Sequence, residues 1–453
     1  MSQCPENGAW RPAPVTNAQV KYATLVAFLA WTFAVYDFIL FGMLLPEIGK
    51  ATGLDDAAQA RLATWVAFGT VVVALAVGPL VDRFGRRAGM VITVGGAGIC
   101  SALTAGAGSI GTLMLALIRS LAGLGYAEQG VNGAYLSELY SASKDPRIAK
   151  RRGLIYSLVQ GGWPIGALLA AGLTAVLLPH VGWQGCFIFA AFPSLIVAFM
   201  ATRLRESPQF EALSKIKALK ASGKNGQAQA LAQSQRLEHE HSAGLASVLK
   251  GKARRATLLL GCAHLLNWFP VQIFSVLGTT VLMSVHHVSF GNSLIILLLS
   301  NLVAYLGYLT HGYFGDRFGR RNVIAVGWML GGAAFWAMLN GPSETWMVIA
   351  LYSIGQFFLI GPYSCLLFYV GESYDSSVRG TGASIVTGIG PVGAIIASAG
   401  SAMFLGAGDS WLQAAIWFGA VPCVLSGFML FFAAPVKQHA EEFEVAQSGH
   451  GSV

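Results

Sequence analysis

The chain has 453 residues, of which 55% are hydrophobic and 11% are charged, and its mean hydropathy is +0.59. Soluble globular domains carry about 25% charged residues, so this composition excludes a soluble protein and indicates an integral membrane protein. The formal net charge of +8 lies in the loops between apolar runs, which makes it a signal of membrane topology rather than of nucleic-acid binding.

Apolar runs of about 20 residues, the length that a helix needs to cross the hydrocarbon core of a bilayer, recur along the whole chain. We expect twelve transmembrane helices, near residues 22–45, 60–81, 88–108, 112–137, 153–178, 183–203, 255–283, 291–313, 322–340, 345–370, 380–405 and 411–433. The 55 glycines suit close contact between helices in lipid, where small residues let backbones approach. The sequence therefore predicts an all-α membrane protein.

Basic residues mark one side of the membrane. The loops that end the even-numbered runs hold Arg83, Arg86, Arg87, Lys144, Arg147, Lys150, Arg151, Arg152, Arg317, Arg320, Arg321 and Arg379. The opposite loops hold only Lys50 and Arg61. Since loops rich in Lys and Arg stay in the cytoplasm, both chain termini are predicted to be cytoplasmic.

One long polar segment separates the sixth apolar run from the seventh, and we interpret it as a cytoplasmic linker between two bundles of helices. A regulatory binding role for this linker is the alternative. The expected parts are a cytoplasmic N-terminal tail (1–20), a six-helix bundle (21–203), the linker (204–254), a second six-helix bundle (255–434) and a cytoplasmic C-terminal tail (435–453).

A short basic motif occurs twice in the chain. Gly78-x-x-x-Asp82-Arg83-Phe84-Gly85-Arg86-Arg87 returns as Gly312-x-x-x-Asp316-Arg317-Phe318-Gly319-Arg320-Arg321, so that Asp316 follows Asp82 by 234 residues. Glu138 and Glu372 have the same spacing. Each copy follows an apolar run. Such a repeat predicts a secondary transporter, in which two halves of the chain move against each other around a central site.

The doubled motif resembles the signature of the major facilitator superfamily, and the resemblance extends over about residues 20–435. Further segments resemble the metabolite:proton symporters and the sialate and aromatic-acid:proton symporters of that superfamily: Tyr36-Asp37-Phe38, Arg119-x-x-x-Gly123-x-Gly125-x-x-Glu128-Gln129-Gly130 and Arg205-Glu206-Ser207-Pro208. Only Tyr36-Asp37 fits the Asp-Gly-Tyr-Asp type of motif in aromatic-acid symporters, and Gln129 stands where relatives often have an aromatic residue. The branch and the substrate stay open.

Three ionisable residues fall within the first and fourth expected helices, where a charge costs several kcal/mol unless it is paired or hydrated. Asp37 lies near the expected midplane, and burial disfavours its charged form, which suits a proton carrier. A cap on a broken helix or a permanent pair with Arg119 is the structural alternative. Glu128 is a second candidate proton site, or else a group bonded to backbone. Arg119 either attracts an anion and biases Asp37, or acts as a strut between helices.

Arg119 and Glu128 are nine residues apart on one expected helix, which places them on roughly opposite faces. The second half differs from the first, because its helix interiors carry neutral polar groups. This predicts that the first half handles protons while the second supplies hydrogen bonds. The expected substrate-binding residues are Arg119, Tyr36, Gln160, Trp163, His264, Asn267, Gln272, Asn301, Tyr305, Gln356 and Tyr363. A satisfied structural histidine is the alternative for His264, and helix packing is the alternative for an aromatic wall of Trp31, Trp163, Trp268 and Phe269.

The doubled motif also predicts a gate. The resemblance implies that Asp82 faces the start of the eleventh helix near Gly380 across the bundle interface, where a helix N-terminus stabilises a carboxylate by about 0.3–2 kcal/mol. Simple topogenic charge is the alternative. The expected gating residues are Gly78, Asp82, Arg83, Gly85, Arg86, Arg87, Glu138, Arg152, Gly312, Asp316, Arg317, Gly319, Arg320, Arg321, Glu372 and Arg379.

These patterns predict a proton-coupled symporter that imports a small organic anion across a bacterial inner membrane by alternating access. A proton-antiport exporter of drugs or metabolites, an uncoupled uniporter and a non-transporting receptor are the alternatives. The chain has no Walker A loop, clustered metal ligands or nucleophile elbow, so neither an enzyme nor a cofactor is expected. The expected partners are the anion, protons and the lipid bilayer, with no nucleic acid, and the protein is expected to be a monomer. Aliphatic carboxylates, sialic-acid-like sugar acids and aromatic acids all remain as substrates.

Overall fold

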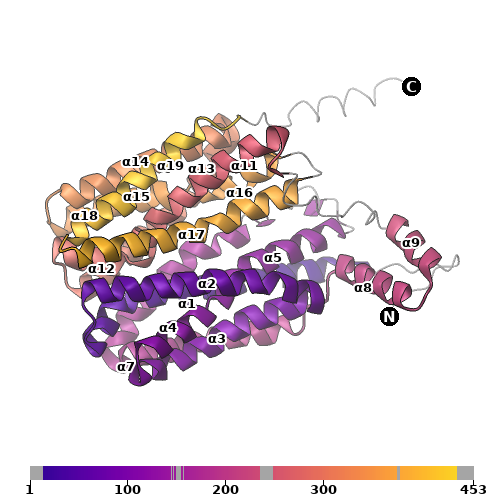
Figure 1. The fold of residues 1–453 in the computed structure, drawn as a ribbon, viewed down its shortest axis with the longest axis horizontal. Helices are drawn as coiled ribbons and strands as arrows, with labels where there is room; N and C mark the ends of the chain where they lie inside the picture. Colours follow the sequence, from indigo (N-terminus) through magenta and orange to yellow (C-terminus); the bar gives the residue numbers. More distant parts are fainter. Residues whose placement is uncertain are drawn as a thin grey trace.

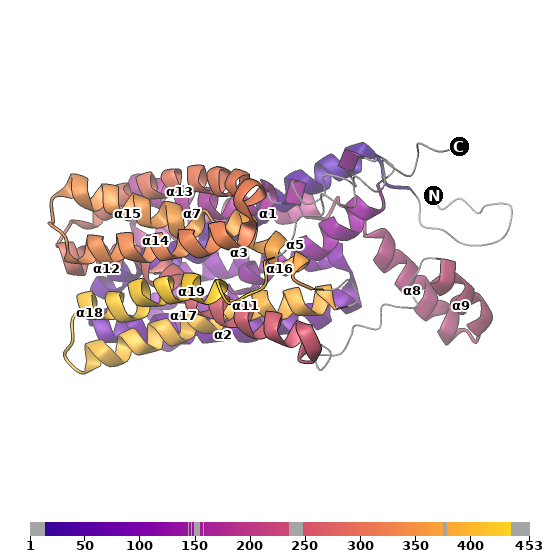
Figure 2. The same ribbon diagram turned by 90° about the horizontal axis from the view of Figure 1, so that it is seen from above.

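The computed structural model describes residues 14–143, 145, 147–148, 155–156, 158–234, 248–374 and 378–435. In this part of the chain every regular element is a helix, and the β pairing is limited to an isolated bridge between Val15 and Ser143. The long helices run along the longest axis of the molecule, and two short helices, α8 and α9, extend from one end (Figures 1 and 2). We call this end the linker end and the opposite one the far end.

The first half of the chain forms a group of long helices that ends before the linker. Its helices are α1 (Asn17–Thr52), α2 (Asp56–Phe84), α3 (Arg86–Ile110), α4 (Thr112–Leu121), α5 (Leu124–Ser141) and α7 (Gly162–Ala201), followed by the linker helices α8 (Pro208–Ala221) and α9 (Asn225–Ser234). Polar caps start the first two helices. The Thr16 hydroxyl and the Gln19 side chain form a capping box at α1, and the Asp55 carboxylate accepts from the Ala58 amide at α2.

The second half forms a similar group, in which several helices are interrupted. Its helices are α11 (Gly251–Pro270), η2 (Val271–Val276), α12 (Gly278–His286), α13 (Phe290–Phe318), α14 (Arg320–Asn340), α15 (Thr345–Ile360), α16 (Tyr363–Glu372), α17 (Arg379–Gly406), α18 (Trp411–Ala415), η3 (Ile416–Ala420) and α19 (Val421–Leu430). The π-helical turn η2 frees the Phe274 carbonyl, which accepts hydrogen bonds from Gln356 Nε2 at 3.1 Å and from the Tyr352 hydroxyl. The interruption is therefore stabilised from α15.

Ten helical stretches of the described chain are long and apolar enough to cross a membrane. One of them, Leu158–Ala201, has 44 residues and contains Gly182, whose positive φ of 65° turns the chain between two helices. The pair α4 and α5, which carries Arg119 and Glu128, is not among the ten. Large apolar side chains cover the outside, with Leu75 72% exposed and Met403 74% exposed. Such a surface is stable against lipid tails rather than water.

The two halves lie side by side (Figure 1), and α2 packs on α17 while α7 packs on α13. At the far end, α1 meets η2 and α12. There the Thr279 hydroxyl donates to the Met43 carbonyl at 2.7 Å. Gly42 lies so close to Val276 that an added Cβ would overlap the Val276 carbonyl oxygen. The halves are thus in intimate backbone contact at the far end.

Candidate functional site

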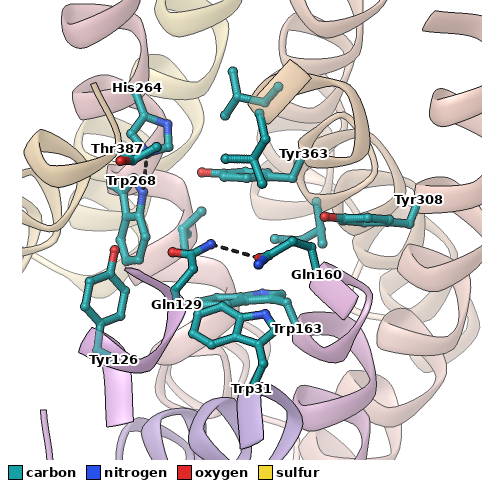
Figure 3. Close-up of a pocket in the computed structure, with 14 residues that line it drawn as sticks. Trp31, Tyr126, Gln129, Gln160, Trp163, His264, Trp268, Tyr308, Tyr363 and Thr387 are labelled. Atoms are coloured by element: carbon teal, nitrogen blue, oxygen red, sulfur yellow. Dashed lines mark hydrogen bonds between the residues drawn. The ribbon is translucent and has the colours of Figure 1, made fainter. Parts of the chain in front are cut away.

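A cavity lies between the two halves, and the space not filled by protein atoms, its opening to solvent included, is about 580 Å³. Both halves contribute to its wall, as Figure 3 shows. The lining residues are Trp31, Tyr126, Gln129, Gln160, Trp163, His264, Trp268, Val271, Tyr308, Ile360, Tyr363, Leu366, Leu367 and Thr387. None of these described lining residues is an Asp, Glu, Lys or Arg. The cavity is therefore aromatic and neutral, with a few polar groups, as small-molecule sites generally are.

Aromatic rings join the two halves across this cavity. Trp268 of α11 meets Tyr126 of α5 with ring centroids 5.5 Å apart, and it meets Trp163 of α7 at 6.1 Å, both edge to face. Trp31 of α1 lies 6.0 Å behind Trp163. Three of the four residues expected to form an aromatic wall thus line the cavity, and Phe269 does not. A planar ligand would find apolar faces and edges from both halves here.

Two hydrogen bonds fix the polar groups of the cavity, and both are drawn in Figure 3. Gln129 Nε2 donates to Gln160 Oε1 at 2.9 Å, and Trp268 Nε1 donates to His264 Nε2 at 3.1 Å. The Tyr363 hydroxyl, which also lines the cavity, donates to Asn267 Oδ1 at 2.7 Å. These bonds leave other polar atoms of the same side chains free to contact a bound molecule.

Asp37 and Arg119 form a buried ion pair at one side of the cavity. Arg119 donates to both Asp37 carboxylate oxygens, at 3.1 and 3.2 Å, and to the Asp37 carbonyl at 3.0 Å. The Ser101 hydroxyl donates to the same carboxylate at 2.6 Å. The rings of Phe41 and Phe187 lie 5.3 and 5.0 Å from the guanidinium. This geometry is that of a strut between α1 and α4, closed off by aromatic rings.

Glu128 is buried in a different way. Its side chain is fully inaccessible, Thr93 of α3 donates to Oε2 at 2.7 Å, and Oε1 has no hydrogen-bond partner in the described part of the chain. No ion pair to Glu128 occurs among the described residues. The next residue, Gln129, faces the cavity. A buried carboxyl without a counter-ion is suited to gaining and losing a proton, since its charged form is costly.

The fourth helix expected from the sequence is divided in the structure into α4 and α5, which carry Arg119 and Glu128. The chain turns at Ala122 and Gly123, where the Gly123 and Gly125 amides donate three residues back instead of four. A Cβ at Gly123 would press on the Thr70 backbone of α2. Arg119 therefore points to α1, and Glu128 to α3.

A second cavity lies beyond the first, towards the far end, and includes Arg119, Gln272, Phe38 and Pro391 in its wall. It shares Tyr126 and Trp268 with the central cavity. This edge-to-face pair thus separates the two spaces. Arg119, which was expected to contact an anion, faces the second cavity rather than the central one.

The other expected substrate-binding residues fall into three groups. Gln160, Trp163, His264 and Tyr363 line the central cavity, and Asn267 supports it through Tyr363. The remaining ones lie elsewhere: Gln272 in the second cavity, Tyr305 in a groove near the linker end, and Tyr36, Asn301 and Gln356 in helix packing. Asn301 Nδ2 donates to the Leu297 carbonyl at 2.8 Å, and Gln356 holds η2.

Among the lining residues that carry a polar group, four were not predicted from the sequence: Tyr126, Gln129, Tyr308 and Thr387. A signal existed for Gln129, which follows a buried acid on the same helix, and for Tyr126, three residues before it. No comparable signal marks Tyr308 or Thr387, because neutral residues on apolar helices look alike until packing orients them.

The two copies of the basic motif build the same cluster at the linker end. In the first copy, Arg86 contacts Asp82 at 2.9 Å and Glu138 at 3.1 Å. In the second copy, Arg320 contacts Asp316 at 2.9 Å and also pairs with Glu372. The described ion pairs of each cluster lie within one half of the chain. Gly85 and Gly319 start the following helices with φ values of 100° and 87°, which only glycine adopts easily.

The other members of the motif have separate roles. Arg83 and Arg317 are exposed and lie over the rings of Phe84 and Phe318. Arg321 donates to the Ala433 carbonyl at 3.0 Å, and the Gly78 and Gly312 positions have open space or ordinary contact around them. Arg152 and the side chain of Arg379 lie outside the described part of the chain, as does the expected contact of Asp82 with the start of α17 near Gly380.

The start of the linker binds to the first cluster. The Glu206 carboxylate accepts from the backbone amides of Arg86 at 2.9 Å and Arg87 at 3.3 Å, at the N-terminus of α3. Ser207 donates to Glu138 and caps α8. The Arg86 guanidinium also lies 5.7 Å from the ring of Phe210 in α8. The linker helix α8 is therefore attached to the first half.

Comparison with known proteins extends over nearly the whole chain. A relative from Corynebacterium glutamicum, a gentisate transporter, is 27% identical over 384 residues, which cover 82% of this chain and 78% of that protein. A cis,cis-muconate transport protein from Acinetobacter baylyi is 26% identical over 406 residues, 86% of this chain and 88% of that protein. The crystal structure of a D-xylose-proton symporter superposes with a TM-score of 0.68 at 16% identity, covering 92% of this chain and 99% of that one, and this shows the fold.

The family model of the Major Facilitator Superfamily matches residues 24–311 and 260–450, and so covers both halves. Together with the doubled motif and the paired clusters, this match shows that the chain is a membrane transport protein that belongs to the Major Facilitator Superfamily.

Proposed function

We propose that this protein is a proton-coupled symporter that imports a small, planar organic acid, aromatic or conjugated, by alternating access. The observation that carries the proposal is the neutral cavity between the halves, which Trp31, Trp163, Trp268 and Tyr126 surround with rings. Gentisate and cis,cis-muconate, the substrates named for two relatives, are both flat unsaturated carboxylates. A sugar-like acid would need more hydrogen-bonding groups than this wall offers.

We assign the coupled proton to Glu128 and Asp37, and protonation would have a different structural effect on each of these two carboxylates. Glu128 has one hydrogen bond and no counter-ion among the described residues, so a proton removes a costly buried charge. Asp37 is paired with Arg119, so a proton there would release the guanidinium. Arg119 keeps its charge in either case. Glu128 next to Gln129 is the carrier nearer to the substrate cavity, and Asp37 is the group that can change the α1–α4 contact.

We further propose twelve membrane crossings with the linker end in the cytoplasm of a bacterial cell, in its inner membrane. The ten apolar stretches become twelve when the turn at Gly182 divides one of them and the α4–α5 pair is included. The basic clusters at Arg86 and Arg320 lie at the end that we assign to the cytoplasm, as the excess of basic residues there requires. Rocking of the two halves would then expose the central cavity alternately to each side.

Proteoliposomes that contain a pH-sensitive dye test the proposal. We expect gentisate and cis,cis-muconate, but not D-xylose, to acidify the lumen. Protein-free liposomes are the necessary control, because protonated acids cross lipid unaided. Glu128→Gln should abolish the protein-dependent part of the signal. Uptake of labelled acid without protein-dependent acidification would instead establish an uncoupled uniporter, and alkalinisation of the lumen would establish antiport.

A further inference from the structure

Three buried N–H groups in the wall of the central cavity have no hydrogen-bond partner in the described part of the chain. They are Trp31 Nε1, Gln160 Nε2 and His264 Nδ1. Their side chains are 2%, 3% and 5% exposed, and they come from separate helical segments. Each buried donor left without a partner costs about 1–3 kcal/mol. A ligand with hydrogen-bond acceptor atoms, bound in the cavity, would give all three donors a partner.

The hydrogen bond between Trp268 and His264 determines which proton His264 carries. An indole nitrogen can only donate, so Nε2 of His264 must accept from Trp268 Nε1. A neutral imidazole that accepts at Nε2 carries its proton on Nδ1, and a doubly protonated ring would set two donors against each other. His264 is therefore a neutral ring with Nδ1–H as a free donor. This places it with the N–H donors of the cavity rather than with its acceptors or charges.

The amide of Gln160 is oriented in the same sense. Its Oε1 accepts from Gln129 Nε2, which makes Nε2 the donor end of the amide, with Tyr156 as a polar neighbour of the side chain. The third donor, Trp31 Nε1, belongs to a group that cannot accept at all. The fully buried polar atoms of the cavity wall that lack a partner in the described part of the chain are thus all N–H donors, although they belong to three residue types.

Arg119, the obvious cation for an acidic substrate, is already paired with Asp37 in this arrangement. Both of its terminal nitrogens are bonded to Asp37, and two phenyl rings flank the guanidinium. It faces the second cavity, beyond the Tyr126–Trp268 pair. A substrate between Trp163 and Trp268 therefore meets neutral donors before it meets a cation.

We infer that the substrate carboxylate is held in the central cavity by the neutral donors Trp31 Nε1, Gln160 Nε2 and His264 Nδ1, and not by Arg119, while its planar carbon skeleton packs against Trp163 and Trp268. The inference rests on the proposed function and adds the place and the chemistry of recognition. Hydrogen bonds to an ionised acceptor are the strong class, so neutral donors suffice to select a carboxylate over an apolar group. Since the site carries no fixed positive charge, it releases the anion more readily than an arginine site would.

Isothermal titration of gentisate into the purified protein tests this assignment. Trp31→Phe, Gln160→Leu and His264→Phe each remove one donor and keep an apolar side chain at the position, and each should raise Kd by about tenfold or more. His264→Asn is the matched control, because its amide nitrogen replaces Nδ1, and it should stay within about threefold of the parent. The double variant Asp37→Asn/Arg119→Gln removes the ion pair without leaving an unpaired charge, and it too should bind within about threefold.

The outcomes distinguish a failure of the donor assignment from a failure of the proposed function. If the parent binds gentisate and the three donor variants bind equally well, or if only the double variant loses binding, the donor assignment is wrong while the proposed function stands. If the parent binds neither gentisate nor cis,cis-muconate, the proposed function fails and the assignment falls with it. Size-exclusion profiles and melting curves identify a variant that has not folded, and the contrast of His264→Phe with His264→Asn then decides on a folded pair.

Discussion

The ion pair of Asp37 with Arg119 allows a sharp prediction, because the two partners are unequal. Both side chains are almost inaccessible, 2% and 3% exposed, and their charged atoms are 3.1 Å apart. Asp37→Asn leaves the Arg119 charge buried with only neutral groups around it. Arginine cannot release its proton at any physiological pH. The reciprocal change, Arg119→Gln, leaves a carboxyl group that can bind a proton and become neutral.

The size of the effect follows from the geometry. Two unit charges 3.1 Å apart attract each other by about 5 kcal/mol at an effective dielectric constant of 20. Removal of one partner of a buried pair typically costs about 3–5 kcal/mol, whereas removal of both is often neutral. We therefore expect Asp37→Asn to lose several kcal/mol, Arg119→Gln to lose less at pH 5 than at pH 8, and the double variant to recover most of the loss.

Thermal unfolding in detergent at a fixed scan rate provides the assay, since membrane proteins often unfold irreversibly and only such matched scans are comparable. The expected order of apparent melting temperature is parent, then the double variant, then Arg119→Gln, with Asp37→Asn lowest. A double variant that melts at or below Asp37→Asn would refute the reasoning, because it would show that the two residues stabilise the fold independently.

Three further substitutions test other parts of the structure. Glu128→Gln should keep thermal stability within about 1 kcal/mol, because the fully buried side chain becomes neutral without changing shape. It should lower pH-driven accumulation of the substrate at least tenfold and leave counterflow exchange of the substrate intact. An equal loss of exchange would indicate that Glu128 binds the substrate instead. Glu138→Gln should accelerate tryptic cleavage in α8 several-fold, since Ser207 loses its charged acceptor. The matching change in the second half, Glu372→Gln, should not accelerate it. Equal cleavage rates in the two variants would show that other contacts hold α8. Gly42→Ala should reduce uptake strongly, because the added Cβ overlaps Val276 across the interface between the halves. Gly106→Ala is the control and should transport normally, because a Cβ there meets open space. Equal uptake by the two variants would show that the contact at the far end is not needed for transport.

The features that could be predicted from the sequence are those marked by the internal repeat or by charged residues within apolar helices. The 234-residue repeat indicated equivalent roles for Glu138 and Glu372, and the structure pairs both with the matching arginines. The alternatives for Asp37 and Arg119 included a pair between them, and the structure contains such a pair. The reason is general, since a charge in lipid must find a partner and few are available.

The features that could not be predicted depend on broken helices. Gln356 looked like a substrate ligand because polar groups are rare on α15, but it serves the carbonyl of Phe274 that the π-helical turn η2 frees. Pro270, directly before η2, marks an interruption of the helix in the sequence, but it does not show that the interruption is π-helical. Likewise, the sequence did not show that the fourth helix is divided into α4 and α5 by a turn at Ala122 and Gly123. Neutral cavity residues such as Tyr308 carry no pattern at all.

The single uncompensated carboxyl has an electrical consequence. Among the buried Asp, Glu, Lys and Arg residues of the described helices, Asp37 and Arg119 cancel each other, and Glu128 alone lacks an opposite charge, while the central cavity is neutral. Under the proposed mechanism, one proton on Glu128 would accompany one monoanion, and each complete transport cycle would move no net charge across the membrane. Each elementary charge moved is worth about 2.3 kcal/mol per 100 mV, and this contribution would vanish. Monoanion uptake would then follow the pH gradient and ignore the membrane voltage, whereas a dianion such as cis,cis-muconate would need a second proton, at Asp37, to cross on the same terms.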